Sequence, residues 1–204
     1  MKRILISLLA ITAFTSAALA APLSFDFKDP KGVNNVVFKL DAPLEAINGS
    51  ASGITGTVSF DPANPAATAG RIVVATASMH VPNPTMKEHL HSAMWMDVAK
   101  HPEMTFEAKS LKNVKTTGDT TTAEAVGTMS VRGVTKEVIV PVKLTYLKDK
   151  LAVRSNGTMK GDLLVLRANF TIKRSDFGIN PRAPEEKVSD AIELSLSIAG
   201  AAPR

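Results

Sequence analysis

Four histidines crowd into one stretch of the sequence and raise the question of a metal site. His80, His89, His91 and His101 fall within 22 positions, and the chain has no other histidine. On a helix, however, His89 and His91 face different sides, whereas a helical zinc pair is spaced by three or four residues. We therefore interpret these histidines as surface or capping residues and predict no metal site.

A second polar pair, Arg174 and Asp176, lies where a predicted strand ends. The two side chains could form a fixed charge pair at the mouth of a barrel, or an ordinary solvated pair that contributes little to stability. The sequence contains no GxSxG, Walker or GxGxxG motif, which mark hydrolase elbows and phosphate-binding loops. We predict no catalytic residues, and we assign His89, Arg174 and Asp176 as polar residues of a mouth or of the framework.

The composition excludes several classes of protein. The 204 residues are 45% hydrophobic and 21% charged, which is the range of globular proteins rather than of disordered or collagen-like chains. The chain has no cysteine, so disulfides, thiolate metal sites, iron–sulfur clusters and a cysteine nucleophile are all excluded.

The first twenty residues predict a secretory signal peptide. Lys2 and Arg3 precede an apolar run, and small residues end at Ala20, which is the order of a cleavable signal. We expect cleavage near Ala20, a periplasmic or secreted location, and one mature domain over residues 21–204 without a transmembrane segment. Losing Lys2 and Arg3 lowers the 24 basic residues to 22, against 19 acidic residues. Because these basic residues are scattered, we expect no nucleic-acid partner.

Most of the mature chain alternates apolar and polar residues with the period of a β-strand. The pattern is clear at residues 54–60, 104–109, 137–146, 164–173 and 192–198, and weaker near 33–40, 71–79, 122–131 and 150–158. Pro141 predicts an edge or a bulge within its strand. Asn48-Gly49 and Asn156-Gly157 are interpreted as hairpin turns. Eight or nine such strands predict an all-β, closed antiparallel barrel, because closure removes exposed edges.

One segment breaks this alternation and predicts a short helix at about residues 84–99. Leu90, Met94 and Val98 repeat every four residues and form one helical stripe, with the only tryptophan, Trp95, beside it. Pro102 follows and ends any helix. We expect this methionine-rich helix to pack on or across the barrel and to cover its cavity.

Three segments of the sequence resemble the YceI-like family of exported lipid-binding proteins. The first runs from Lys87 to Phe106 and includes His-Leu-His-Ser, Trp-Met-Asp and a proline before the next strand. The second, residues 127–136, reads Gly-Thr-Met-Ser-Val-Arg-Gly-Val-Thr-Lys, and the third covers residues 171–179 and 188–190. Together they are spread over residues 87–190, more than half of the mature chain, in the order of the family's pattern.

This resemblance implies a lipocalin-like, eight-stranded antiparallel barrel with a helix near one end. It also implies binding of an isoprenoid quinone, a polyprenyl lipid or another long-chain amphiphile, and no other cofactor. Combined with the strand pattern, it predicts a ligand-binding set of inward-facing residues: Phe38, Phe60, Leu90, Met94, Trp95, Phe106, Met129, Leu144, Tyr146, Phe170 and Ile172.

The sequence therefore predicts an exported carrier that is not an enzyme. Each buried methylene contributes about 0.8 kcal/mol before ordering costs, so a long chain can bind without polar recognition. Two alternatives stay open at this point. One is a small exported enzyme that acts on a lipid-like substrate, and the other is an interaction module with a packed barrel. A homodimer is also open.

Overall fold

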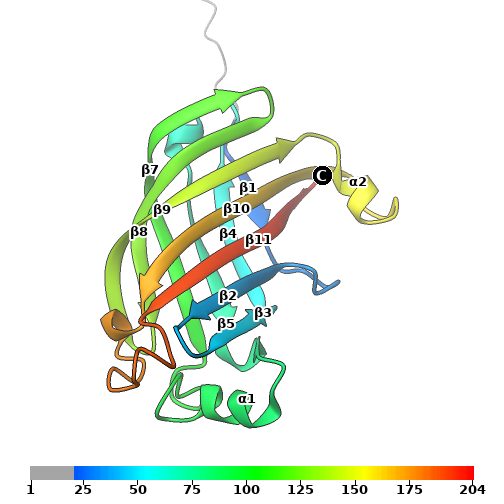
Figure 1. Cartoon of the computed structure of the whole chain (residues 1–204). Helices are drawn as coiled ribbons and strands as arrows, with labels where there is room; N and C mark the ends of the chain where they lie inside the picture. The colour runs from blue at the N-terminus through cyan, green and yellow to red at the C-terminus, as the bar shows by residue number, and fades with distance from the viewer. Residues whose placement is uncertain (1–20) are drawn as a thin grey trace, which may run out of the picture.

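The predicted barrel is present in the computed structural model, which describes residues 21–204. The expected signal peptide, residues 1–20, lies outside the described residues. Eight antiparallel strands close on themselves (Figure 1). The closed set is β1 (Leu23–Asp26), β4 (Ile54–Phe60), β5 (Ala69–Ala75), β7 (Glu103–Thr117), β8 (Thr120–Val131), β9 (Val134–Leu147), β10 (Gly161–Lys173) and β11 (Ala191–Pro203).

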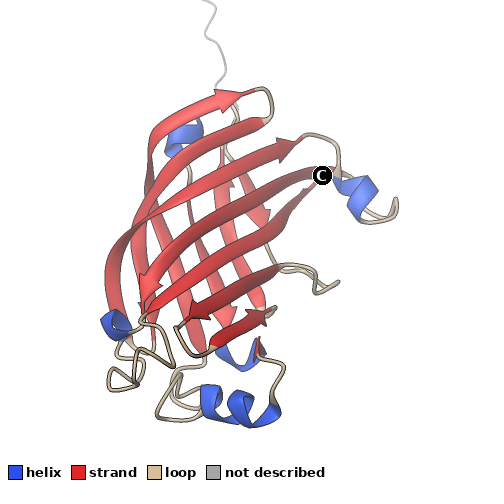
Figure 2. Cartoon of the chain, in the orientation of Figure 1, coloured by secondary structure: helices blue, strands red, loops and turns tan. Residues whose placement is uncertain are grey.

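Shorter elements surround this barrel, and Figure 2 shows the helices at its ends. Three further strands extend the sheet beside β11: β2 (Asn35–Asp41), β3 (Ala46–Ala51) and β6 (Met79–His80). The α-helices are α1 (Pro84–His91) and α2 (Leu151–Arg154), and the 3-10 turns are η1 (Pro65–Ala67), η2 (Thr76–Ser78) and η3 (Ser175–Phe177). None of the helices within residues 21–204 is long and apolar enough to cross a membrane.

The two ends of the barrel differ in width because two strands, β1 and β2, pair with different stretches of the same side of β11. Near its C-terminal end, Ala201 of β11 pairs with Asp26 of β1, which closes the eight-stranded ring. Its earlier half, residues 193–197, pairs instead with β2, which in turn pairs with β3. At the α1 end, β2 and β3 extend the sheet from β11, whereas at the other end β1 alone lies beside it. The barrel therefore widens toward α1 (Figure 1).

The prediction of an edge or bulge at Pro141 is explained by a local separation of two strands. β9 pairs with β8 along almost its whole length, but its pairing with β10 covers only Val142–Leu147. Pro141 comes directly before this paired stretch. Since proline has no backbone N–H to donate, it is tolerated where its strand has lost one neighbour.

Two local predictions were wrong. Residues 150–158 form no strand: they form α2 and the turn after it, in which Ser155 accepts from and donates to the backbone of Met159. Asn48-Gly49 is not a turn but lies inside β3, where Gly49 is opposite Phe38. A Cβ atom on Gly49 would lie 2.1 Å from Cζ of Phe38, so this glycine leaves room for an aromatic ring rather than for a turn.

Candidate functional site

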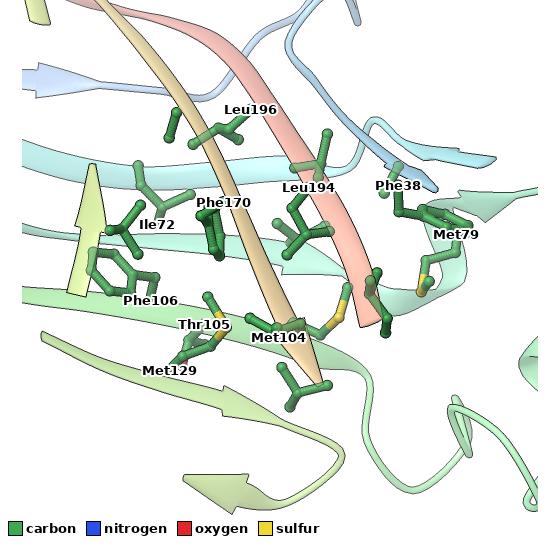
Figure 3. A pocket seen from close by; sticks show the side chains of 18 of the residues that line it. Phe38, Ile72, Met79, Met104, Thr105, Phe106, Met129, Phe170, Leu194 and Leu196 are labelled. Carbon is green, nitrogen blue, oxygen red and sulfur yellow. The ribbon is translucent and has the colours of Figure 1, made fainter. Parts of the chain in front are cut away.

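The lumen of the barrel contains an apolar cavity of about 370 Å³. Every strand of the described chain except β1 contributes to its wall, and α1 contributes from one end. Figure 3 shows side chains from several strands, including Ile72, Phe106 and Phe170, around this common space. Its size is typical of small-molecule sites. Side chains therefore do not fill the lumen along its whole length, which argues against the packed barrel of the interaction-module alternative.

The structure brings most of the predicted ligand-binding residues together on this wall. Eight of them line the cavity: Phe38, Leu90, Trp95, Phe106, Met129, Leu144, Phe170 and Ile172. The strand residues are there because every second side chain of an antiparallel barrel points inward. The helix residues are there because α1 and the loop after it lie across the wide end of the barrel (Figure 1).

Met94 was wrongly placed in the cavity. Its side chain is 65% exposed and does not line the wall. The reason is that the helix ends earlier than the four-residue spacing predicted. The N–H of Ser92 caps α1 by donating to carbonyls of its last turn, and the N–H of Trp95 then donates to the carbonyl of Ser92. Beyond this cap the helical stripe no longer sets side-chain directions.

Phe60 and Tyr146 were also expected on the wall, but they lie beyond the end of the cavity. Together with Phe25 they form a cluster of three rings, which we call the aromatic plug. Its ring centroids are 6.0–6.4 Å apart, within the range of favourable aromatic pairs. Phe25 and Phe60 are almost fully buried, so the plug closes the narrow end of the barrel.

The plug is attached to a buried carboxylate. The hydroxyl of Tyr146 donates to Asp162 at 2.8 Å, and the backbone N–H of Asp149 donates to the other oxygen of Asp162 at 2.8 Å. Arg204 also pairs with Asp162. Burial and the bond to Asp162 raise the pKa of Tyr146 to about 12. Burial alone would raise the pKa of Asp162, but its hydrogen bonds and Arg204 hold that pKa below its usual value.

The sequence reasoning missed part of the wall. Ile72, Met79, Met104, Leu194 and Leu196 also line the cavity (Figure 3). Alternation at residues 104–109 and 192–198 does place Met104, Leu194 and Leu196 on the inward faces, but the predicted ligand-binding set did not include them. Five methionines lie on the wall, at positions 79, 86, 96, 104 and 129. Methionine is flexible and polarisable, so this part of the wall can adapt to ligands of different shape.

The cavity opens at the α1 end. Its most exposed lining residues, Glu45 and His89, both lie there. The Nε2 of His91 donates to the carbonyl of Met79 at 2.8 Å and attaches α1 to β6. Arg132 donates to the carbonyls of Ala93 and Gly178. These bonds hold the helix and the neighbouring loops around the opening, which we call the mouth.

Arg174 and Asp176 do not form the charge pair that the sequence suggested. Asp176 lies at the surface and pairs with Lys136 at 2.7 Å. Arg174 is 1% exposed and lines the cavity near the mouth. Its guanidinium donates to backbone carbonyls of residues 179–189, including those of Ile179 and Asn180. Arg174 therefore holds this segment, the mouth loop, in place.

The polar groups on the wall are few, and the charged and imidazole groups among them lie at or near the mouth. Thr68, Thr105, Glu45, His89 and Arg174 are its only polar or charged side chains. Within residues 21–204, no three histidine, aspartate or glutamate side chains gather as a metal site. The arrangement can remove an apolar chain from water and gives it few partners for hydrogen bonds, so it fits a ligand that is mainly hydrocarbon.

Comparisons with known proteins agree with this architecture. A family model described as "YceI-like domain" matches residues 29–199. A UPF0312 protein of Pseudomonas savastanoi pv. phaseolicola is 31% identical over 206 residues, covering 98% of this chain and 97% of the relative.

Two solved structures share the fold at low sequence identity. BcnA of Burkholderia cenocepacia has a TM-score of 0.65 and 18% identity, covering 81% of this chain and 95% of that one. A domain of Saccharophagus degradans described as polyisoprenoid binding has a TM-score of 0.64 and 9% identity, covering 89% of this chain and 99% of that one. At these identities the likeness establishes the barrel architecture.

Proposed function

The chain belongs to the YceI-like domain family, and from this premise we propose that it is an exported carrier that binds an isoprenoid or another long-chain lipid in its lumen. The observation that carries the proposal is the continuous apolar wall of the 370 Å³ cavity. A chain placed there loses contact with water along its length, and burial contributes about 0.8 kcal/mol per methylene before ordering costs. A lipid of ten or more apolar carbons therefore binds usefully without specific polar contacts.

The orientation of the lipid follows from the distribution of polar groups. The narrow end of the barrel is closed by the aromatic plug, and the exposed polar residues Glu45 and His89 lie at the mouth. A polar headgroup buried at the plug would lose its hydrogen bonds with water. The lipid therefore binds with its chain inside and its headgroup at the mouth. The polyisoprenoid-binding description of the Saccharophagus degradans domain supports an isoprenoid as the first ligand class to test.

The direct test is native mass spectrometry of the protein purified from the periplasm of its own cells, followed by organic extraction. We expect one bound isoprenoid or long-chain lipid per barrel. Purified apo protein should also take up added quinones or polyprenols. A protein that carries no lipid and takes up neither ligand would contradict the proposal.

A Trp95 fluorescence titration gives an independent readout. Trp95 is the only tryptophan, and its side chain lines the cavity at the mouth. Because indole emission depends on the polarity around the ring, a lipid that fills the mouth should shift it. Met94→Trp in a Trp95→Phe background is a matched control, since position 94 is 65% exposed and lies outside the cavity. Emission from that exposed tryptophan should change much less.

A further inference from the structure

On β4, β9 and β10 the cavity ends at one level of the barrel. Val58 of β4, Leu144 of β9 and Leu166 of β10 line it. The next inward residues toward the narrow end are Phe60, Tyr146 and Leu164, and none of them lines it. The register agrees, because Leu166 pairs with Leu144 and Leu164 pairs with Tyr146.

Beyond this level the lumen is filled. Phe25 and Leu164 are 0% exposed and Phe60 is 2% exposed. The Phe25 ring meets those of Phe60 and Tyr146 edge-on, at 6.4 and 6.3 Å between centroids. Closely packed interiors have no spare volume for additional methylenes, so the end of a lipid chain cannot pass these rings.

The aromatic plug is also held in place by the hydrogen bond from Tyr146 to Asp162. If Tyr146 swung aside, it would break its bond to Asp162, a residue that is 2% exposed. Leaving a buried carboxylate without one of its donors is costly. The network that includes Asp149 and Arg204 therefore holds the Tyr146 ring in place against an incoming chain.

We infer that the aromatic plug sets the maximum length of lipid chain that the barrel can bury. The inference rests on the proposed function and names the residues that determine its chain-length specificity. Each added methylene should raise affinity about fourfold while it still finds space inside. Once the chain end reaches the plug, further carbons stay outside the mouth and affinity stops rising.

The test is competition binding with a graded series of straight-chain alcohols and polyprenols, read by native mass spectrometry. For the unmodified protein, occupancy should rise with chain length and then level off. Phe60→Ala removes about six ring carbons from the plug and leaves a cavity of that size if the surroundings do not collapse. The levelling-off should then move to longer chains, by at least one isoprene unit in the polyprenol series.

Two further variants keep the test decisive. Phe60→Leu removes fewer atoms and should shift the levelling-off in the same direction by a smaller step, which covers the case in which Phe60→Ala does not fold. Leu151→Ala is the matched control, because Leu151 is 2% exposed in α2 and lines neither the cavity nor the plug. It should lower stability without changing the preferred length.

The outcomes separate the two proposals. If the unmodified protein binds none of the alcohols or polyprenols, the proposed function fails. If it binds them with a length limit that is the same in Phe60→Ala and Phe60→Leu, lipid binding stands and the plug is not the determinant. If the chain-length limit moves only in Leu151→Ala, the plug is likewise not the determinant and the inference is overturned.

Discussion

The cavity exists because several inward positions carry small residues. Ala108, Ala125 and Ala168 all line the wall at levels where leucine or phenylalanine would fill the lumen. An eight-stranded barrel is just wide enough for side chains to fill its interior. These residues therefore decide whether the lumen holds side chains or a ligand.

Filling the lumen at one of these positions should abolish binding. In Ala168→Trp the indole occupies space that is empty in the apo protein, so we expect at least a tenfold loss of lipid affinity and little change in melting temperature. Asn169→Trp is the matched control, because Asn169 is the next residue on β10 and is exposed on the outer face. Equal lipid affinity in Ala168→Trp and the unmodified protein would contradict the lumen assignment.

Tyr146 should titrate far from the usual range. It is the only tyrosine of the chain, so the ultraviolet absorbance of phenolate reports it directly. Burial and the bond to Asp162 raise its pKa to about 12, against about 10 in an unfolded chain. The stabilisation linked to this shift is fully present below pH 10 and is lost as pH rises through 12.

Asp162→Asn tests how much the bond to Asp162 raises the pKa of Tyr146. It removes the carboxylate that accepts the Tyr146 hydroxyl bond, so the Tyr146 pKa should fall part of the way toward its usual value, while burial, the larger cause, still raises it. A native protein whose phenolate absorbance already develops near pH 10 would show that the ring is not held as described.

At the scale of elements, the mouth loop depends on one side chain. Arg174 follows β10 directly, and its guanidinium reaches five backbone carbonyls of residues 179–189. Among the described residues, it has no carboxylate within ion-pair distance. Asp190 lies near enough for the Arg174 charge to contribute to its lowered pKa, together with hydrogen bonds from Ser175 that outweigh the effect of burial. The carbonyls therefore provide most of the solvation of this buried cation.

Arg174→Met should release the mouth loop. Each buried carbonyl left without a donor costs about 1–3 kcal/mol, so we expect a loss of at least about 3 kcal/mol in the free energy of unfolding. Amide hydrogen exchange over residues 178–190 should accelerate before that of the barrel strands. Arg182→Met is the control, since Arg182 is an exposed arginine of the same loop. Unchanged exchange in Arg174→Met would contradict this role.

The elements that sequence could predict were those whose pattern repeats over many residues. The runs at 164–173 and 192–198 are parts of β10 and β11, and the alternation placed Phe170 and Ile172 inward as observed. The failures were local. The Asn48-Gly49 pair looks like a turn, but Gly49 is needed opposite a ring that lies eleven residues earlier in the chain.

The site residues also divide into those that a repeating sequence pattern predicts and those that depend on local structure. The helical spacing that placed Leu90 correctly also placed Met94 inward, because a cap at Ser92 depends on backbone bonds that spacing does not reveal. Likewise, alternation identifies Phe60 and Tyr146 as inward residues but does not tell where along the barrel the cavity stops. That level depends on how three rings from three strands pack together.

At the scale of the whole molecule, lipid binding should stabilise the fold. The ligand binds a lumen that exists only when the barrel is closed, so it favours the folded state by mass action. At a free lipid concentration 100 times Kd we expect about 2.7 kcal/mol of stabilisation, measured as a rise in melting temperature. Ala168→Trp should show no such rise. A rise of equal size in that variant would place the lipid on the outer surface instead.

Because the aromatic plug closes the narrow end of the barrel, the mouth also fixes the direction in which a lipid enters and leaves. A lipid that lies with its tail against the plug must leave headgroup first. A second copy of the same barrel, mouth facing mouth, would then receive the headgroup first, although its own lumen accepts only the tail. Direct handover between two such barrels therefore requires the lipid to turn end for end outside both of them. A bilayer receives the molecule without this problem, because its leaflet lets a newly arrived lipid reorient before the tail is buried again.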